Sequence, residues 1–251
     1  MCIAAFAWDA HPDWLLIALG NRDEFHSRPS GPLERWDDGS GIIAGRDLLA
    51  GGTWLGVSDL GRFALVTNYR VLGPGYPQPG RPSRGELVTI ALSGGETASL
   101  NRYNPFNLLL AEVTGAWLLS NHPEEQRIPL SPGVHGLSNG DFSQPWPKTR
   151  QLCGDVSDWL ANDARNLEPL LAALRKETPG PAPGELGNGP DPDFAPVFIR
   201  RPIYGTRCST VVAITRDGHG TIIERRFKED GSADGESALT FHWPISQAAI
   251  P

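Results

Sequence analysis

The chain has 251 residues, of which 22 are Lys or Arg and 29 are Asp or Glu, so its formal net charge is −7. That balance argues against nonspecific binding of nucleic acid, which needs a basic surface. The length favours a single domain over residues 1–251, and the sequence contains no run of about 20 apolar residues that could span a membrane.

The first predicted element is a β-hairpin. Apolar residues 3–8 and 14–19 flank a turn that contains Pro12, which cannot serve a strand ladder. Antiparallel pairing about this turn makes the numbers of paired residues sum to roughly 22–24, which sets Cys2 opposite residues 20–22. We therefore expect Cys2 and the polar segment at 21–24 to share one end of the hairpin.

Two further hairpins are predicted, at 53–67 and 209–227. The first has Gly61 at the turn position that favours a positive φ, and the second contains Asp217-Gly218, a strong hairpin signal. Short strands are expected at 116–120 and 241–243. Apolar residues at helical spacing predict three helices, over residues 85–93, 148–160 and 167–176.

The order of these elements indicates the fold class. Strands open and close the chain and helices lie between them, without the regular alternation that a parallel doubly wound fold requires. We predict an α+β protein with two mainly antiparallel sheets and helices packed outside them. Segments 73–82 and 177–196, rich in Pro and Gly, are predicted to be exposed loops.

The cysteines and histidines indicate a compartment and limit metal chemistry. Cys2, Cys153 and Cys208 are too few for a disulfide framework, so we expect free thiols in a reducing, cytoplasmic setting. The six histidines are scattered and no Cys/His spacing typical of a metal site occurs, so no metal is expected. Haem ligation by a single His or Cys stays open.

Cys2 is the first candidate for chemistry. A small second residue allows Met1 to be removed by methionine aminopeptidase, which would leave Cys2 with both a thiol and a free α-amine. One residue would then supply nucleophile and general base, as in N-terminal nucleophile enzymes. The alternative is that Cys2 is a small apolar residue buried at a strand start.

The segment at 21–24 supplies polar groups beside that thiol. Arg22 would lower the pKa of the thiol, and Asp23 would hydrogen-bond and orient the ammonium group. The alternative is a solvated loop in which Arg22 and Glu24 form surface ion pairs of little energetic weight.

Three residues further along could bind a substrate. Asn68 and Asn139 could each donate an amide N–H to a developing oxyanion, although Asn beside Gly is also typical of turns. Arg207 could bind a carboxylate or phosphate through two parallel hydrogen bonds, or could be an exposed residue before a strand.

A series of motifs along the whole chain resembles one known family. They begin with Met1-Cys2-Ile3 and the segment Asn-Arg-Asp-Glu-Phe at 21–25, and the series follows the family's order over essentially the whole chain. The others lie at 27–29, 51–56, 67–69, 84–88, 106–108, 136–139, 145–148 and 204–207. In these motifs the chain resembles the NRDE family, also called the transport and Golgi organisation family.

The resemblance implies that residues 1–251 form one NRDE-family domain with an αββα sandwich similar to N-terminal nucleophile hydrolases. It implies Cys2 as nucleophile, Asp23 as the acid that orients the amine, Asn68 and Asn139 as oxyanion or amine contacts, and a late arginine at Arg207. We assign a further set to substrate binding: Asn21, Arg22, Glu24 and Tyr69. Those hydrolases carry an arginine three residues before the aspartate, where this chain has Gly20.

Two functions follow as expectations. One is hydrolysis of a C–N amide or a thioester bond through Cys2, without a cofactor. The other is binding and trafficking of haem, an acyl-CoA or a lipid without turnover, which the resemblance to this family also implies. Each takes a small molecule as partner, without nucleic acid and without integral membrane association. A purely structural module is the third reading, in which neither Cys2 nor Asp23 affects a ligand.

Overall fold

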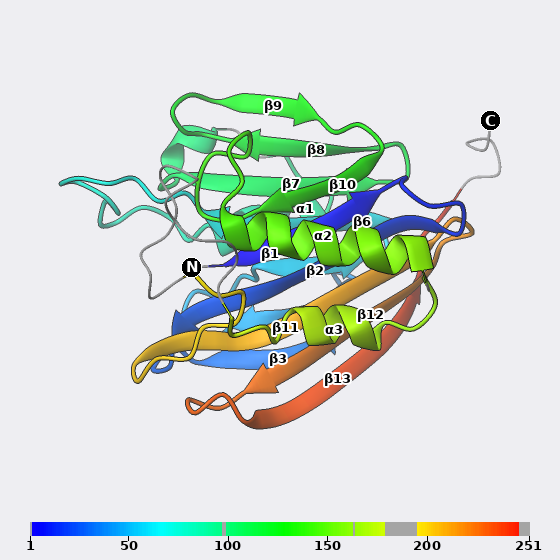
Figure 1. Ribbon diagram of the computed structural model, residues 1–251. Coiled ribbons are helices and arrows are strands. Elements are labelled where there is room, and N and C mark those ends of the chain that lie inside the picture. The colour runs from blue at the N-terminus through cyan, green and yellow to red at the C-terminus, as the bar shows by residue number, and fades with distance from the viewer. Residues whose placement is uncertain (1, 97–98, 163, 179–194, 246–251) are drawn as a thin grey trace.

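The computed structural model describes residues 2–96, 99–162, 164–178 and 195–245. Two antiparallel sheets are stacked face to face, and helices cover their outer faces (Figure 1). The layers are therefore helix, sheet, sheet and helix. The predicted class, an α+β sandwich of two mainly antiparallel sheets, is confirmed.

The first sheet holds the two ends of the described chain. Its six strands lie in the order β10-β1-β2-β11-β12-β13. In chain order they are β1 (Ile3–Trp8), β2 (Trp14–Phe25), β10 (Gly133–Leu137), β11 (Tyr204–Thr215), β12 (His219–Phe227) and β13 (Ala233–His242). Helices α2 (Pro147–Asn162) and α3 (Glu168–Ala173) lie across its outer face (Figure 1).

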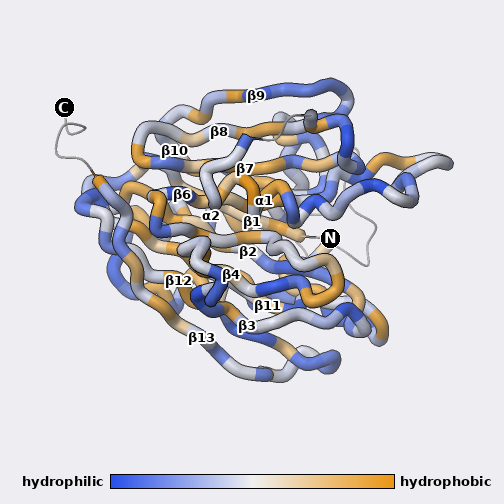
Figure 2. Tube along the Cα trace, turned by 180° about the vertical axis from the view of Figure 1, so that it is seen from behind, coloured by the Kyte–Doolittle hydropathy of each residue, from blue (hydrophilic) through white to orange (hydrophobic). Residues whose placement is uncertain are grey.

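The second sheet is built from the middle of the chain. Its seven strands follow chain order: β3 (Ser30–Arg35), β4 (Ile42–Asp47), β5 (Leu55–Ser58), β6 (Arg62–Asn68), β7 (Phe106–Glu112), β8 (Gly115–Ser120) and β9 (Gln126–Pro129). Helix α1 (Gly85–Leu92) packs on its outer face, and a 3-10 turn, η1 (Leu100–Arg102), precedes β7. The edge strands β9 and β13 are mostly exposed and hydrophilic, as Figure 2 shows.

Strand β1 is apolar along its whole length because both of its faces are buried. Ala4 and Phe6 enter the core between the two sheets, whereas Ile3 and Ala5 pack under α2 and α3. A strand buried on both faces needs no polar alternation, since neither face meets water. No helix among the described residues has the length and apolar character needed to cross a membrane.

The three predicted hairpins and three predicted helices are present, with several changes of boundary. The first hairpin continues six residues beyond 14–19, to Phe25, because β11 pairs with β2 along its full length. The interpretation of 21–24 as a solvated loop is therefore wrong, and Asn21, Arg22 and Asp23 are buried strand residues. The last strand begins at Ala233 rather than at 241.

Four strands of the second sheet, β3, β4, β7 and β9, were not expected from the sequence. The predicted loop at 73–82 contains neither helix nor strand. Most of the other predicted loop, 177–196, lies outside the described residues.

Candidate active site

The first hairpin brings Cys2 to the polar end of β2. Ile3 pairs with Asn21, so paired numbers sum to 24, within the range expected from the turn. Carried one residue further, this register sets Cys2 beside Arg22. On the other side of β1, Ser138 donates a hydrogen bond of 3.1 Å from Oγ to the backbone oxygen of Cys2.

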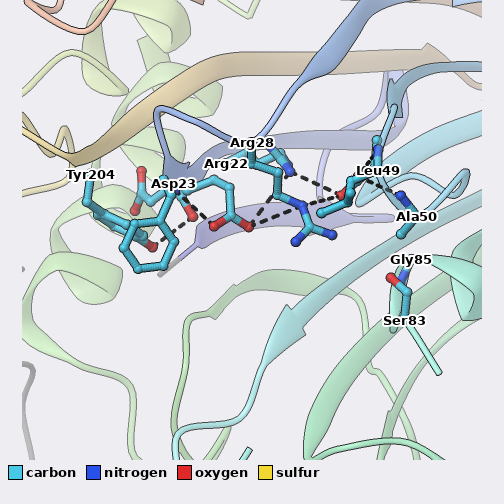
Figure 3. Close-up of polar contacts among 11 residues, drawn as sticks. Arg22, Asp23, Arg28, Leu49, Ala50, Ser83, Gly85 and Tyr204 are labelled. Carbon is cyan, nitrogen blue, oxygen red and sulfur yellow. Dashed lines mark hydrogen bonds and ion pairs between the residues drawn. The ribbon is translucent and has the colours of Figure 1, made fainter. Parts of the chain in front are cut away.

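Arg22 and Asp23 leave β2 on opposite faces because successive strand residues alternate. Arg22 faces the second sheet, where its Nη2 lies 3.3 Å from Oδ2 of Asp47 on β4. Asp23 points the other way, and its Oδ1 accepts a 2.7 Å hydrogen bond from the hydroxyl of Thr206. The Tyr204 hydroxyl donates to the backbone oxygen of Asp23 at 2.8 Å (Figure 3).

The electrostatic setting keeps the thiol protonated at neutral pH. Burial raises the pKa of the Cys2 thiol, and the Asp23 charge raises it further, although the Arg22 guanidinium lowers it. Arg22 therefore acts on this pKa in the expected direction, but burial outweighs the single cation. Burial also raises the pKa of the Asp23 carboxyl, with opposing charges on Lys148 and Arg22. A base is needed to form the Cys2 thiolate.

A cavity of about 480 Å³ opens between the two sheets beside these residues. Cys2, Arg22, Asp23 and Glu24 line it from the first sheet. Its lining contains four acidic residues and seven arginines, namely Arg22, Arg28, Arg46, Arg81, Arg84, Arg207 and Arg226. The lining is therefore cationic in a chain whose formal net charge is −7, which suits an anionic group on a ligand.

Two arginines of the cavity wall, Arg22 and Arg28, are held by one acidic side chain. Asp47 Oδ2 accepts hydrogen bonds from Arg28 at 2.7 Å and from Arg22 at 3.3 Å. Its Oδ1 accepts from the backbone N–H groups of Leu49 and Ala50. Figure 3 shows Arg22 and Arg28 directed toward the turn that carries Leu49 and Ala50. The guanidinium of Arg22 is thereby fixed in the cavity wall.

The two asparagines differ in position. Asn68 lies at the exposed end of β6 and lines the cavity, so its amide can reach a ligand there. Asn139 is buried and does not contribute to the lining. Its Nδ2 donates a 2.7 Å hydrogen bond to the backbone oxygen of Asn68, which fixes the end of β6. Of the two predicted oxyanion contacts, only Asn68 is placed to touch a substrate.

Asn21 and Tyr69, both predicted to bind substrate, lie outside the cavity wall. The Asn21 amide donates to the backbone oxygens of Leu174 and Val197 and accepts from the hydroxyl of Ser209. The two donated bonds tie β2 to the segments that follow α3 and precede β11, and the accepted bond ties it to β11. The Tyr69 ring packs against His122 at 4.8 Å between centroids.

Arg207 lies within β11, at an irregularity between Thr206 and Cys208 where the pairing with β2 shifts by one residue. The prediction that it precedes the strand is wrong, because the strand begins at Tyr204. Its side chain lines the cavity, and its Nη1 lies 3.1 Å from Nδ1 of His26. A bulge re-aims a side chain, which explains how Arg207 reaches the cavity.

Sequence analysis missed three charged residues of this region. Asp47 lies in a strand that was not predicted. Arg84 precedes α1, lines the cavity and interacts electrostatically with Cys2. Lys148 is completely buried in the first turn of α2 and interacts electrostatically with Asp23 and Cys2. Its spacing of four residues from Leu152, on the apolar stripe of that helix, is the sequence signal that could have identified it.

Strands β11 and β12 of the first sheet add a second thiol and a buried acid to the cavity lining. Cys208 and Glu224 are 7% and 3% exposed, and burial raises the pKa of both groups. Oε1 of Glu224 accepts a 2.9 Å hydrogen bond from the backbone N–H of Leu33. Within the described ranges, no three His, Cys, Asp or Glu side chains form a group that could hold a metal ion.

Gly20, where similar hydrolases carry an arginine, has no room for a side chain. A Cβ there would lie 2.6 Å from the backbone oxygen of Ile3 and 3.2 Å from the ring of Trp54. Trp54 therefore fills the space in this chain, and positive charge near Cys2 comes from Arg22, Arg84 and Lys148 instead.

Comparison of the sequence with known proteins gives one family. The family model described as Transport and Golgi organisation 2 matches residues 1–229. A Transport and Golgi organization protein 2 homolog of Homo sapiens is 36% identical over 262 residues, covering 90% of this chain and 92% of that protein. A homolog of Mus musculus is 32% identical, covering 94% of this chain and 97% of that protein.

Comparison with solved structures gives the fold. An N-acylethanolamine-hydrolyzing acid amidase ortholog of Caenorhabditis elegans matches with a TM-score of 0.53 and 12% identity, over 84% of this chain and 92% of that one. Penicillin V acylase of Agrobacterium tumefaciens matches with a TM-score of 0.51 and 11% identity, over 90% of this chain and 83% of that one. A mutant of conjugated bile acid hydrolase from Clostridium perfringens matches with a TM-score of 0.53 and 8% identity, over 98% of each chain. The predicted likeness to the N-terminal nucleophile hydrolase fold is confirmed.

Proposed function

The chain belongs to the Transport and Golgi organisation 2 family, and we propose that it hydrolyses a C–N amide or thioester bond with Cys2 as nucleophile. The observation that carries this proposal is the placement of Cys2 beside Arg22 and Asp23 at the wall of the cavity. The printed names of the structural neighbours, an amidase, an acylase and a hydrolase, support the reaction class.

The first step requires removal of Met1, which frees the α-amine of Cys2. That amine titrates near pH 7.7–8.0 in an unperturbed peptide, so about half of it is neutral at that pH and able to act as a base. It accepts the thiol proton, which overcomes the raised pKa of the half-buried Cys2 thiol. Asp23 holds the resulting ammonium in place, because its carboxylate lies at the same end of the hairpin.

The thiolate then attacks the carbonyl carbon of the substrate and forms a C–S bond. Negative charge passes to the carbonyl oxygen, which the amide of Asn68 stabilises by hydrogen bonding. The C–N or C–S bond of the substrate breaks as the ammonium returns its proton to the leaving group. Water attacks the acyl-enzyme, its proton goes to the amine, and the carboxylic acid leaves while the thiol is restored.

The intact mass of the protein and its acylation test this mechanism together. We expect purified protein to lack Met1 and to form an acyl adduct at Cys2 with a panel of N-acyl amides and acyl thioesters. Cys2→Ala should abolish adduct and turnover. Cys153→Ala should leave both unchanged, because that thiol lies on α2 and burial raises its pKa to about 11. Full activity in protein that retains Met1, or in Cys2→Ala, would contradict the proposal.

A second function, carriage of an anionic small molecule without turnover, is favoured by the seven arginines of the cavity lining. They would pair with the propionates of haem or with the phosphates of an acyl-CoA, and Cys2 would be the candidate ligand of a haem iron. The expected result is saturable binding that weakens with salt and with Arg84→Gln. Absence of both a haem absorbance shift and acyl-CoA binding would exclude it. The free thiols support a reducing, cytoplasmic compartment for either function.

A further inference from the structure

Lys148 is a fully buried charged residue that the proposed mechanism leaves unused. It is 0% exposed, although lysine is almost never fully buried without a partner. It continues the buried stripe of α2 formed by Leu152 and Val156, at a spacing of four residues. The side chain is therefore directed into the protein by the same helical face that packs on the first sheet.

The path of α2 places Lys148 at the Cys2 end of β1. Thr149 packs on Gly136, which pairs with Ala5 near the start of β1. At the other end of the helix, Trp159 contacts Trp14 at the turn of the first hairpin. The helix therefore runs from the site toward the hairpin turn, and its first turn lies beside the site.

Gly136 allows this close approach. A Cβ at that position would lie 2.5 Å from Sγ of Cys153 and 2.5 Å from Cγ2 of Thr149. Only a residue without a side chain lets the helix sit so near β10, and that nearness seals Lys148 from water.

The ammonium group of Lys148 lacks a hydrogen-bond acceptor among the described residues. An ammonium has three donors, and burying it without hydrogen bonds is costly unless nearby negative charge compensates. Burial lowers the pKa of the Lys148 ammonium, and the negative charges of Asp23 on β2 and of Cys2 oppose that shift and favour the charged form. The titratable residue of β10, His135, does not face Lys148. Its ring stacks on Phe6 between the sheets, and its Nε2 lies 2.8 Å from the backbone oxygen of Ser131.

We propose that Lys148 is a positioning residue of the Cys2 site, a sealed cation that stabilises negative charge on Asp23 and on the Cys2 sulfur. It acts from the helix layer, behind the first sheet, whereas Arg22 acts from the cavity side. The inference rests on the proposed function, because it takes Cys2 as the reactive group. It needs only that the thiol ionises, so its test is independent of turnover.

The pH dependence of Cys2 alkylation tests this role. Iodoacetamide reacts with the thiolate, and mass spectrometry of the Cys2 peptide separates this thiol from Cys153 and Cys208. In Lys148→Met we expect the midpoint of the alkylation rate to rise by about one pH unit, which slows alkylation about tenfold at neutral pH. Lys148→Arg should restore most of the rate, because it keeps the charge. Lys176→Met is the matched control, since Lys176 pairs with Asp155 away from the site.

A profile of Lys148→Met that superimposes on the wild type, or an equal shift in Lys176→Met, overturns the proposal. If Lys148→Met does not fold, the double variant Asp23→Asn/Lys148→Met decides, since it removes both charges. Folding of the double variant alone shows that the two charges depend on one another and supports the proposal. Failure of both variants to fold shows a role in packing and overturns it. If the alkylation profiles shift as expected but the wild-type protein hydrolyses none of the substrates, only the proposed reaction is contradicted.

Discussion

Replacing Asp47 with Asn is expected to destabilise the protein and at the same time to make the Cys2 thiol more reactive. Asp47 compensates the charges of Arg22 and Arg28, whose side chains are 10% and 28% exposed. An Asn keeps the hydrogen bonds from the turn but presents an NH₂ group to the two guanidinium groups. Removing one partner of a buried pair costs 3–5 kcal/mol, and because these groups are partly exposed we expect about 3 kcal/mol. The uncompensated Arg22 then lowers the pKa of Cys2.

Urea unfolding at several pH values and alkylation of Cys2 measure the two effects. Burial opposes ionisation of Asp47, yet hydrogen bonds from Arg28 and from the turn hold its pKa below the usual range. The stability it contributes is therefore present above pH 4, and is lost as the pH falls through the folded pKa. Asp38→Asn is the matched control, because Asp38 and Arg46 form an exposed pair worth about 0–1 kcal/mol. Equal losses in both variants, or slower alkylation in Asp47→Asn, would refute this reasoning.

Two further predictions concern packing and pH. Gly136→Ala should cost about 1–3 kcal/mol in unfolding free energy, because its methyl group would overlap Cys153. Gly154→Ala, on helix α2 with open space at the Cβ position, should instead stabilise by about 0.5–1 kcal/mol. Changes of the same sign in the two variants would contradict this packing. Burial raises the pKa of Glu224, so the native state binds its proton more tightly and its contribution to stability falls as the pH rises above about 4.3. Glu224→Gln should match the wild type near pH 4 and become the more stable protein toward pH 7 in thermal unfolding, since Gln still accepts from Leu33; a pH-independent difference would contradict it.

The sequence predicted the parts of the fold that depend on local pattern. The turn at 9–13 fixed the register of the first hairpin, and that register alone places Cys2 near Arg22. The missed strands β4 and β7 carry weaker local signals, because their apolar residues do not alternate with polar ones. Such strands are identified by the neighbours they pair with, which only the folded chain provides.

The site residues were missed for the same reason, because their partners are brought near only by the folded chain. Asp47 reaches Arg22 across the two stacked sheets, and no spacing in the sequence relates them. Lys148 was easier to predict than Asp47, because its place on the apolar stripe of Leu152 predicts a buried side chain whatever the tertiary fold. A charged residue on the apolar face of an amphipathic helix is therefore a better indicator of a site than a polar cluster at a strand end, which is also typical of loops.

The alternation of β2 explains how one strand controls the thiol from two sides. Arg22 faces the cavity, where Asp47 neutralises part of its charge, and Asp23 faces the helix layer, where Lys148 opposes its charge. Because Cys2 lies at a strand end, both pairs act on its thiol. Burial keeps the thiol protonated until a base accepts its proton. A change to any one of the four charges should shift the reactivity of Cys2, in a direction set by the sign of the charge removed.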